Sequence, residues 1–398
     1  MVTRTMVSGV AGLLAAALFA AGCSEPTGPA RVSPAPGNPG AVAVETGGGL
    51  ASATSSGIVL NQVNSTLGLS GTTLIKGFNP TNPHHGDAIV VSFFWLGSAN
   101  IIQSVTDVLT LPGFPVVGNT YNLVEYVTSG GVSMATYVAT NVQGFPDPYS
   151  DPVHGDSILA VRATLSQPVT DGGMMMKSYS GVYPIYTQAL GQHSSAFGSG
   201  LSITTASPGA ISVGAGSLVY GVSMSNGSGL FAPPAGFTNI LTMSDASMWA
   251  DGEDVVPAAT GPVNPQWTWD FNAPRTWLAS VLTLGEAVTQ LAFTAQPSTS
   301  LPCPMTMGPV EVTAENAEGN RVTTYNGDVT IAIGHNGGAL MNGNLSGTLT
   351  VHALNGVARF SDLCIDQPNL PGNGYTLQAT VPALNLRVES SAFNIGVM

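Results

Sequence analysis

The sequence predicts an all-β protein, built as a larger two-sheet β-sandwich followed by a smaller β-sandwich. Two observations lead to this prediction. Only 8% of the 398 residues are charged, while glycine (49 residues) and proline (28 residues) are abundant, and this composition suits strands joined by tight turns better than solvated helices. From about residue 56 onward, short segments rich in apolar residues recur between turn residues, with no credible helix between them.

Residues 1–22 are predicted to be a lipoprotein signal peptide. Arg4 supplies a basic start, and the apolar run over residues 10–21 is shorter than the roughly 20 residues that a membrane span requires. The run ends in "AAGC", which resembles the bacterial lipobox, although Ala20 stands where leucine is usual. The resemblance implies cleavage before Cys23 and lipidation of that cysteine. An ordinary signal peptide with an incidental cysteine is the alternative.

Residues 23–55 are predicted to be a disordered tether behind the lipid anchor. Their first half is rich in proline, their second half is rich in glycine, serine and alanine, and no hydrophobic period exists that could build a core. Because Ser24 and not aspartate follows Cys23, the similarity to such lipoproteins implies an outer-membrane lipoprotein, surface-exposed or facing the periplasm. The lipid attached to Cys23 is expected to anchor the protein in the membrane. The net charge of −13 argues against a nucleic-acid partner.

Residues 56–286 contain about twelve candidate strands, which favours a two-sheet sandwich of the jelly-roll kind. The segments "GDAIVVSFFW", "GNTYNLVEY", "MMMKSYSG" and "TWLASVLTL" resemble, in that order, a jelly-roll-like module common in exported bacterial proteins. These segments consist of turn and core residues, so the resemblance implies a fold and no particular chemistry. Relative to that module, residues 108–117 ("VLTLPGFPVV") are an apolar insertion, which is open to interpretation as a ligand-contacting lip or a hydrophobic contact.

Residues 287–398 are predicted to form the smaller sandwich. In "GDVTIAI", Val329, Ile331 and Ile333 alternate with smaller or more polar residues, as in a half-buried strand. This segment, together with "GPVEVTAENAEGNRVTTYN" and "LSGTLTVHALNGVARFSDLCID", resembles the bacterial immunoglobulin-like repeats found in tandem on surface proteins. The resemblance implies an immunoglobulin-like β-sandwich of about seven strands that serves as a brace or spacer.

Cys303 and Cys364 are predicted to form a disulfide in this smaller sandwich. They are the only cysteines besides Cys23, and export past the inner membrane permits pairing. The alternative is two buried thiols that act as small apolar groups.

No familiar catalytic, cofactor-binding or metal-binding motif is present, so the sequence predicts no enzyme, no cofactor and no metal ligand. Two features remain open. The acidic stretch 245–254 ("DASMWADGED") fits either a solvated acidic loop or a calcium loop, and the solvated loop is favoured. Glu125 or Glu253 could serve in glycoside hydrolysis, but nothing in the sequence distinguishes them from other acids.

The candidate ligand-binding residues are aromatic. In "QWTWDFNAP", Trp267, Trp269 and Phe271 alternate with polar residues and share one face of a strand. A stripe of this kind is either the inner wall of a core or a platform on which sugar rings stack, and the polar residues between the aromatics favour the core. Trp249, in the acidic stretch, is the better candidate for an exposed ring.

We therefore expect a surface-anchored lipoprotein that acts as a binding or adhesion module without catalysis. Its ligand would be a glycan or another surface protein. A carbohydrate-active hydrolase with an accessory immunoglobulin-like domain and a purely structural cell-envelope protein are the alternatives.

Overall fold

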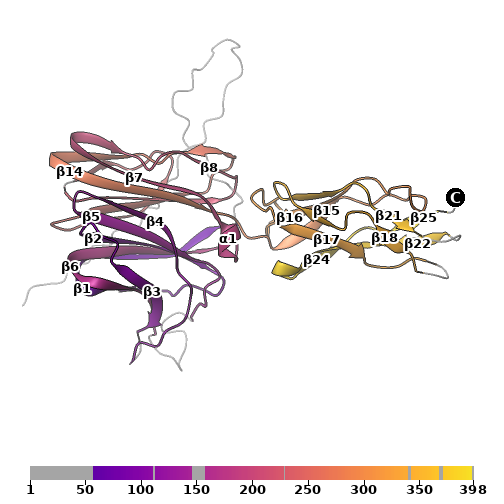
Figure 1. The fold of residues 1–398 in the computed structure, drawn as a ribbon, viewed down its shortest axis with the longest axis horizontal. Coiled ribbons are helices and arrows are strands. Elements are labelled where there is room, and N and C mark those ends of the chain that lie inside the picture. The colour runs from indigo at the N-terminus through magenta and orange to yellow at the C-terminus, as the bar shows by residue number, and fades with distance from the viewer. Residues whose placement is uncertain are drawn as a thin grey trace, which may run out of the picture. The chain divides into compact units, whose positions relative to one another are not determined.

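The fold is taken from a computed structural model that describes residues 57–110, 113–145, 157–227, 229–338, 342–366 and 371–396. The predicted signal peptide, the tether and Cys23 lie outside the described residues. Nearly every described element is a strand, which confirms the predicted all-β fold (Figure 1). The proposed boundary near residue 286 stays a prediction.

Residues 59–284 form two six-stranded sheets that stack as the layers of a sandwich (Figure 1). In the first sheet the order is β1-β6-β2-β5-β4, with β3 also paired to β6; the second has the order β10-β14-β9-β12-β11, with β7 also paired to β14. All of these pairings are antiparallel. The first-sheet strands are β1 (Val59–Gly77), β2 (Ala88–Leu96), β3 (Ile102–Leu109), β4 (Asn122–Ser129), β5 (Val132–Ala139) and β6 (Leu159–Ser180).

The second sheet consists of β7 (Leu190–Ala206), β9 (Leu218–Ser225), β10 (Leu230–Ala232), β11 (Thr238–Ser244), β12 (Trp249–Val255) and β14 (Trp267–Leu284). A small additional ladder joins β8 (Ile211–Val213) to β13 (Gly261–Val263), and the helical turn α1 (Tyr186–Ala189) precedes β7. The layer between the two sheets is mainly apolar, because residues from both sheets belong to one buried cluster that includes Phe94, Met175, Tyr220, Val222 and Leu278. The buried Lys177 is a polar exception within it.

The three long strands β1, β6 and β14 each join two apolar segments that are separated in the sequence by turn-forming residues. The reason is visible in β1, where Gly68 and Gly71 have positive φ angles and the register with β6 shifts around them. Glycine adopts this conformation readily, so the turn-like residues form bulges that bend one strand and do not end it.

Residues 290–395 form two facing sheets, of order β15-β16-β20 and β19-β17-β23-β24, with two further two-stranded ladders, β18-β21 and β22-β25. The strands are β15 (Gln290–Ala295), β16 (Val310–Glu315), β17 (Asp328–Ile333), β18 (Asn344–Ser346), β19 (Thr350–His352), β20 (Val357–Phe360), β21 (Cys364–Asp366), β22 (Gly372–Tyr375), β23 (Leu377–Val381), β24 (Leu386–Glu389) and β25 (Phe393–Ile395). The 3-10 turn η1 (Pro382–Leu384) connects β23 to β24.

Two predictions for this region are confirmed. Val329 and Ile331 are buried and the residues between and after them are more exposed, as the alternation in β17 predicts. Cys303 and Cys364 form a disulfide with a Cα–Cα distance of 5.2 Å across a sequence separation of 61.

Candidate functional site

The aromatic stripe of β14 lies inside the protein. Trp267, Trp269 and Phe271 have almost no exposed surface and form one buried cluster. The Trp267 Nε1 donates a hydrogen bond to Asp251 Oδ2 of β12 (2.9 Å), and the Trp269 Nε1 donates to Ser223 Oγ of β9 (3.2 Å). The first half of β14 therefore packs over β9 and β12. Because neither indole has a free face, Trp267 and Trp269 are wrong as ligand-binding candidates in this structure, and the core interpretation of the stripe applies.

Trp249 is half-buried and packs against the same cluster, so the expectation that its ring is exposed is not met. The acidic stretch around it is also not a solvated loop. Its second half is the strand β12, in which Asp251 and Glu253 are fully buried on the face that meets Trp267. Hydrogen bonds from Asn239 Nδ2 to Asp251 Oδ1 (3.0 Å) and Glu253 Oε1 (2.7 Å) compensate for part of the burial.

A buried lysine faces the other side of β12. Lys177 of β6 has no exposed surface, and its Nζ has no hydrogen-bond partner among the described residues. The Nζ lies 4.1 Å from the ring centroid of Tyr220 and over Gly252, where a Cβ atom would come within 2.6 Å of it. Burial lowers the pKa of Lys177 to about 7, although the nearby Asp254 and other carboxylates act in the opposite direction.

The carboxylates of β12 respond to the same burial in the opposite sense. Burial raises the pKa of Glu253 to about 8, assisted by the neighbouring Asp251. The pKa of Asp254 is also raised by burial, against the opposing influences of Lys177 and of the hydrogen bond that Tyr179 donates to its Oδ2 (3.0 Å). These groups form a buried polar cluster, and because Lys177 and Glu253 are inaccessible to solvent, we do not consider the cluster a ligand site.

The exposed counterpart of the stripe is the opposite face of the same strands. Asp270 and Asn272, the polar residues that alternate with the aromatics, are exposed. On one side Asp270 is paired with Ile203 of β7, which is 57% exposed. On the other side Leu230 of β10 is paired with Trp269 and points inward, so its neighbour Phe231 points outward and is 67% exposed. We call the surface formed by Phe231, Thr268, Asp270, Asn272 and Ile203 the outer face.

Part of the outer face is hollowed. A shallow depression of about 330 Å³ is lined by Phe231, Asp270 and Asn272, together with the backbone around Gly229 and Leu230. An aromatic ring beside a carboxylate and an amide is the combination that holds a sugar, because the ring stacks on the apolar face of a pyranose while the polar groups bond its hydroxyls. The outer face lies on the opposite side of strand β14 from Trp267 and Trp269, the candidates that the sequence offered.

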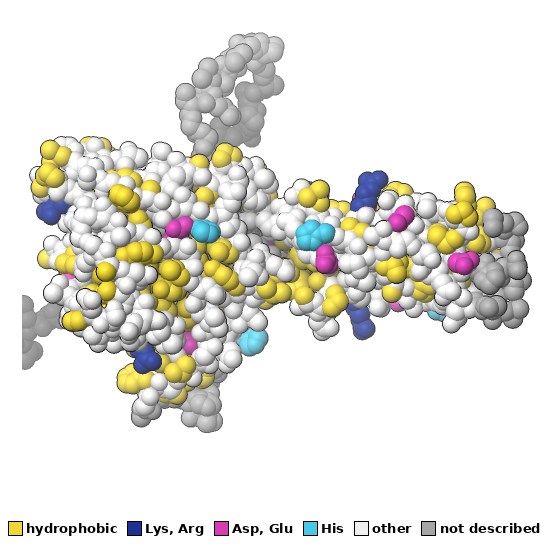
Figure 2. All heavy atoms as spheres, in the orientation of Figure 1, with side chains coloured by type: hydrophobic (Ala, Val, Ile, Leu, Met, Phe, Trp, Pro, Cys, Tyr) yellow, Lys and Arg dark blue, Asp and Glu magenta, His cyan; other side chains and the backbone are white. Residues whose placement is uncertain are grey.

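The surface around such a site carries little positive charge. The whole chain has nine Lys and Arg residues, and Figure 2 shows how sparsely they are scattered over the face in view. Along β14 the nearest cation is Arg275, which is half-buried against Gly227 and donates a hydrogen bond to Asn226 O (3.2 Å). The only charged side chain of the outer face is therefore that of Asp270.

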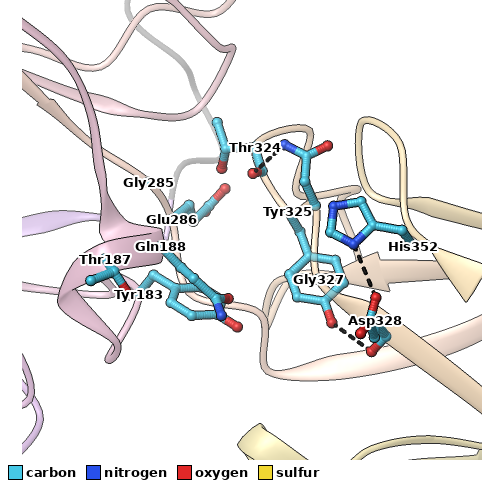
Figure 3. Close-up of a pocket in the computed structure, with 11 residues that line it drawn as sticks. Tyr183, Thr187, Gln188, Gly285, Glu286, Thr324, Tyr325, Gly327, Asp328 and His352 are labelled. Atoms are coloured by element: carbon cyan, nitrogen blue, oxygen red, sulfur yellow. Dashed lines mark hydrogen bonds and ion pairs between the residues drawn. The ribbon is translucent and has the colours of Figure 1, made fainter.

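A second pocket, of about 400 Å³, is lined by residues of four separate segments (Figure 3). The rings of Tyr183 and Tyr325 pack against each other with centroids 6.2 Å apart, and both are almost fully buried. At the rim the exposed pair His352 and Asp328 lies within hydrogen-bond distance (3.0 Å). Because the two tyrosine rings pack against each other and are buried, neither ring is available to a ligand, and the accessible part of the pocket is its polar rim. Its residues are far apart in the sequence, and no local pattern predicts them.

The two acids named for glycoside hydrolysis belong to separate networks. Glu125 of β4 bonds His193 Nδ1 and accepts from Ser195 Oγ of β7, both at 2.6 Å. Glu253 is buried with Asp251. In the Glu125 group the carboxylate lies between the histidine and the serine, so the imidazole is not placed to take a proton from the hydroxyl, as nucleophilic catalysis requires.

The 108–117 insertion is a hairpin in its described part. The Leu109 N–H donates to Pro115 O and the Val117 N–H donates to Asp107 O. Phe114 and Val116 are exposed, so the insertion presents apolar side chains to solvent. This exposure is compatible with both interpretations of the insertion.

Among the described residues, no group of three or more histidine, cysteine, aspartate or glutamate side chains is placed to hold a metal ion. In the same part of the chain, none of the helices has the length and apolar character that a membrane crossing would require. Comparison with protein-family models and with curated proteins finds no match for this chain.

Proposed function

We propose that this protein is a surface-anchored lipoprotein that binds glycans through the outer face, without catalysis. The observation that carries the proposal is the exposed ring of Phe231, which adjoins Asp270 and Asn272 in one depression. The ring of Phe231 is 67% exposed on a strand, so its face is available for stacking on a sugar. The adjacent carboxylate and amide supply the polar groups that would orient a sugar.

The anchor is the second part of the proposal. Lipidation of Cys23 followed by the tether 24–55 would hold the folded strands away from the bilayer, where they can reach glycans of a cell surface. The smaller sandwich would act as a brace or spacer. A surface protein as the ligand remains the competing candidate, and a carbohydrate-active hydrolase finds less support, since Glu125 and Glu253 lie in separate networks.

The test is a glycan array probed with the exported chain, in which Cys23→Ser keeps the protein soluble. We expect binding to a defined set of glycans and a loss of at least tenfold in the Phe231→Ala variant. Phe197→Ala is the matched control, because Phe197 is 59% exposed on β7 but lies outside the outer face as defined. Equal binding by wild type and Phe231→Ala would contradict the proposed site, and loss of binding in the Phe197→Ala variant alone would move the site.

A further inference from the structure

The outer face is longer than the depression that contains Phe231. Phe231, Asp270 and Ile203 lie on three neighbouring strands, β10, β14 and β7, and form a row across them. Neighbouring strands are about 4.8 Å apart, so the row from β10 to β7 extends over about 10 Å. A single pyranose ring does not span that length.

The two ends of the row are apolar and its middle is polar. Phe231 ends the row on β10, and Ile203 ends it on β7 with 57% of its surface exposed. Asp270 and Asn272 occupy the central strand between them. Sugar chains have the same repeat of surfaces, because apolar C–H faces alternate with hydroxyl groups along them.

The charge of the row limits which sugar chains fit. Asp270 is its only charged side chain, and Arg275, the nearest cation along β14, is engaged with Asn226. With a net charge of −13, the protein as a whole also repels anions. An anionic sugar would place its carboxylate near Asp270 without a compensating cation, which disfavours it.

We propose that the outer face binds an uncharged glycan chain of two or more rings, laid across β10, β14 and β7. Phe231 forms the first apolar subsite and Ile203 the second, and Asp270 and Asn272 bond the hydroxyls between them. This inference rests on the proposed function and adds the ligand's charge, its minimum length and its direction relative to the strands.

The experiment is titration calorimetry of the exported chain with Cys23→Ser against cello-, manno- and malto-oligosaccharides, each from the monosaccharide to the hexasaccharide. Oligogalacturonates of equal lengths are the anionic counterpart. For at least one neutral series we expect the affinity to rise at least tenfold from one ring to three and then to level off. The oligogalacturonates should bind at least tenfold more weakly than that series.

Two variants separate the subsites. Ile203→Ser should remove the increase of affinity with chain length, while Phe231→Ala should weaken the binding of every member of the series, the monosaccharide included. Both positions are exposed, so neither change should shift the midpoint of a urea titration, and this titration checks that both variants are folded.

The outcomes of these measurements distinguish a failure of the two-subsite inference from a failure of the proposed function. Binding that requires Phe231 but shows no dependence on length, or no effect of Ile203→Ser, overturns the two-subsite inference and leaves the proposed function in place. Equal affinity for oligogalacturonates overturns the charge selectivity. If none of the sugars binds and the glycan array is also blank, the proposed function fails and this inference fails with it.

Discussion

Replacing Lys177 with methionine should stabilise the protein at mildly alkaline pH. The Nζ of Lys177 is buried without a hydrogen-bond partner among the described residues, and burial lowers its pKa from 10.5 to about 7. In the unfolded chain the amine is protonated up to pH 10.5, whereas in the folded protein it loses its proton above pH 7. Between these values the unfolded state binds more protons, so the lysine favours unfolding, and this effect fades as pH rises.

The free-energy cost of the buried lysine depends on how far the pH lies below 10.5, the pKa of the lysine in the unfolded chain. One pKa unit corresponds to about 1.36 kcal/mol, so at pH 8 the lysine costs the folded state about 3 kcal/mol, and at pH 9.5 about 1 kcal/mol. Methionine has a similar length and no charge, and it suits a layer that already contains Met175. We therefore expect Lys177→Met to raise the free energy of unfolding by about 3 kcal/mol at pH 8, with the gain approaching zero near pH 10.5.

Urea denaturation followed by tryptophan fluorescence at pH 8, 9 and 10 measures this difference. All five tryptophans lie between Trp95 and Trp277, so the signal reports on the sandwich that contains Lys177. Lys76→Met is the control, because Lys76 is the only other lysine and is partly exposed; its effect should stay within about 0.5 kcal/mol. A Lys177→Met variant that is less stable than wild type at pH 8, or a gain that does not shrink with pH, would refute the reasoning. Either result would mean that the amine is charged and paired in the folded state.

Four further predictions concern other parts of the chain. Glu253→Gln should stabilise the protein increasingly from pH 4.5 to about 8, because the pKa of the buried Glu253 is raised and folding must keep it protonated; a pH-independent difference in urea midpoint would contradict this. Replacing Cys303 and Cys364 by serine should lower stability by about 4 kcal/mol on the chain-entropy model, and an unchanged melting temperature would argue against it. Cys23→Ser should move the protein from the membrane fraction to the soluble fraction, whereas absence of fatty-acid labelling in the wild type would exclude the anchor. Separate fragments ending and starting at residues 286–290 should each unfold cooperatively, and an unfolded C-terminal fragment would show that the boundary is misplaced.

The sequence predicted the fold class well because its signal is repeated over the whole chain. Scarce charge and frequent turn residues recur from about residue 56 onward, and strands such as β14 and β17 add period-two alternation, so the errors in single segments cancel. Strand boundaries were predicted less well. Gly68 and Gly71 are turn residues by composition, yet they form bulges within β1, and only the pairing with β6 distinguishes a bulge from a strand end.

The candidate site was predicted only in part, for a physical reason. The alternation in "QWTWDFNAP" predicts a strand with one aromatic and one polar face. It does not predict which of the two faces packs against the rest of the protein. The packing of β14 over β9 and β12 buries the aromatic face, and this contact is between segments far apart in the sequence. No sequence pattern distinguished Phe231 as exposed, because a single phenylalanine between turn residues is equally compatible with a buried position.

Asp251 and Glu253 show the same limit for charge. Acidic residues in a glycine-containing stretch indicate a solvated loop when only composition is considered. In the structure the strand pairing of β12 on both sides forces alternate residues inward. Asn239, Thr242 and Trp267 donate hydrogen bonds to three of the four carboxylate oxygens, while Glu253 Oε2 is buried without a partner among the described residues. The partners of a buried acid are tertiary contacts, which a single sequence does not display.

Strand β14 divides two tasks between odd and even positions. Trp267, Trp269 and Phe271 are locked into packing, while Thr268, Asp270 and Asn272 between them point away from it. Side chains at the even positions can therefore be exchanged with little effect on stability, and each exchange would alter the chemistry of the outer face. A library randomised at residues 268, 270 and 272, together with Phe231 and Ile203, would keep a constant scaffold under a variable contact surface, and this library would be the starting point for a screen against different sugars.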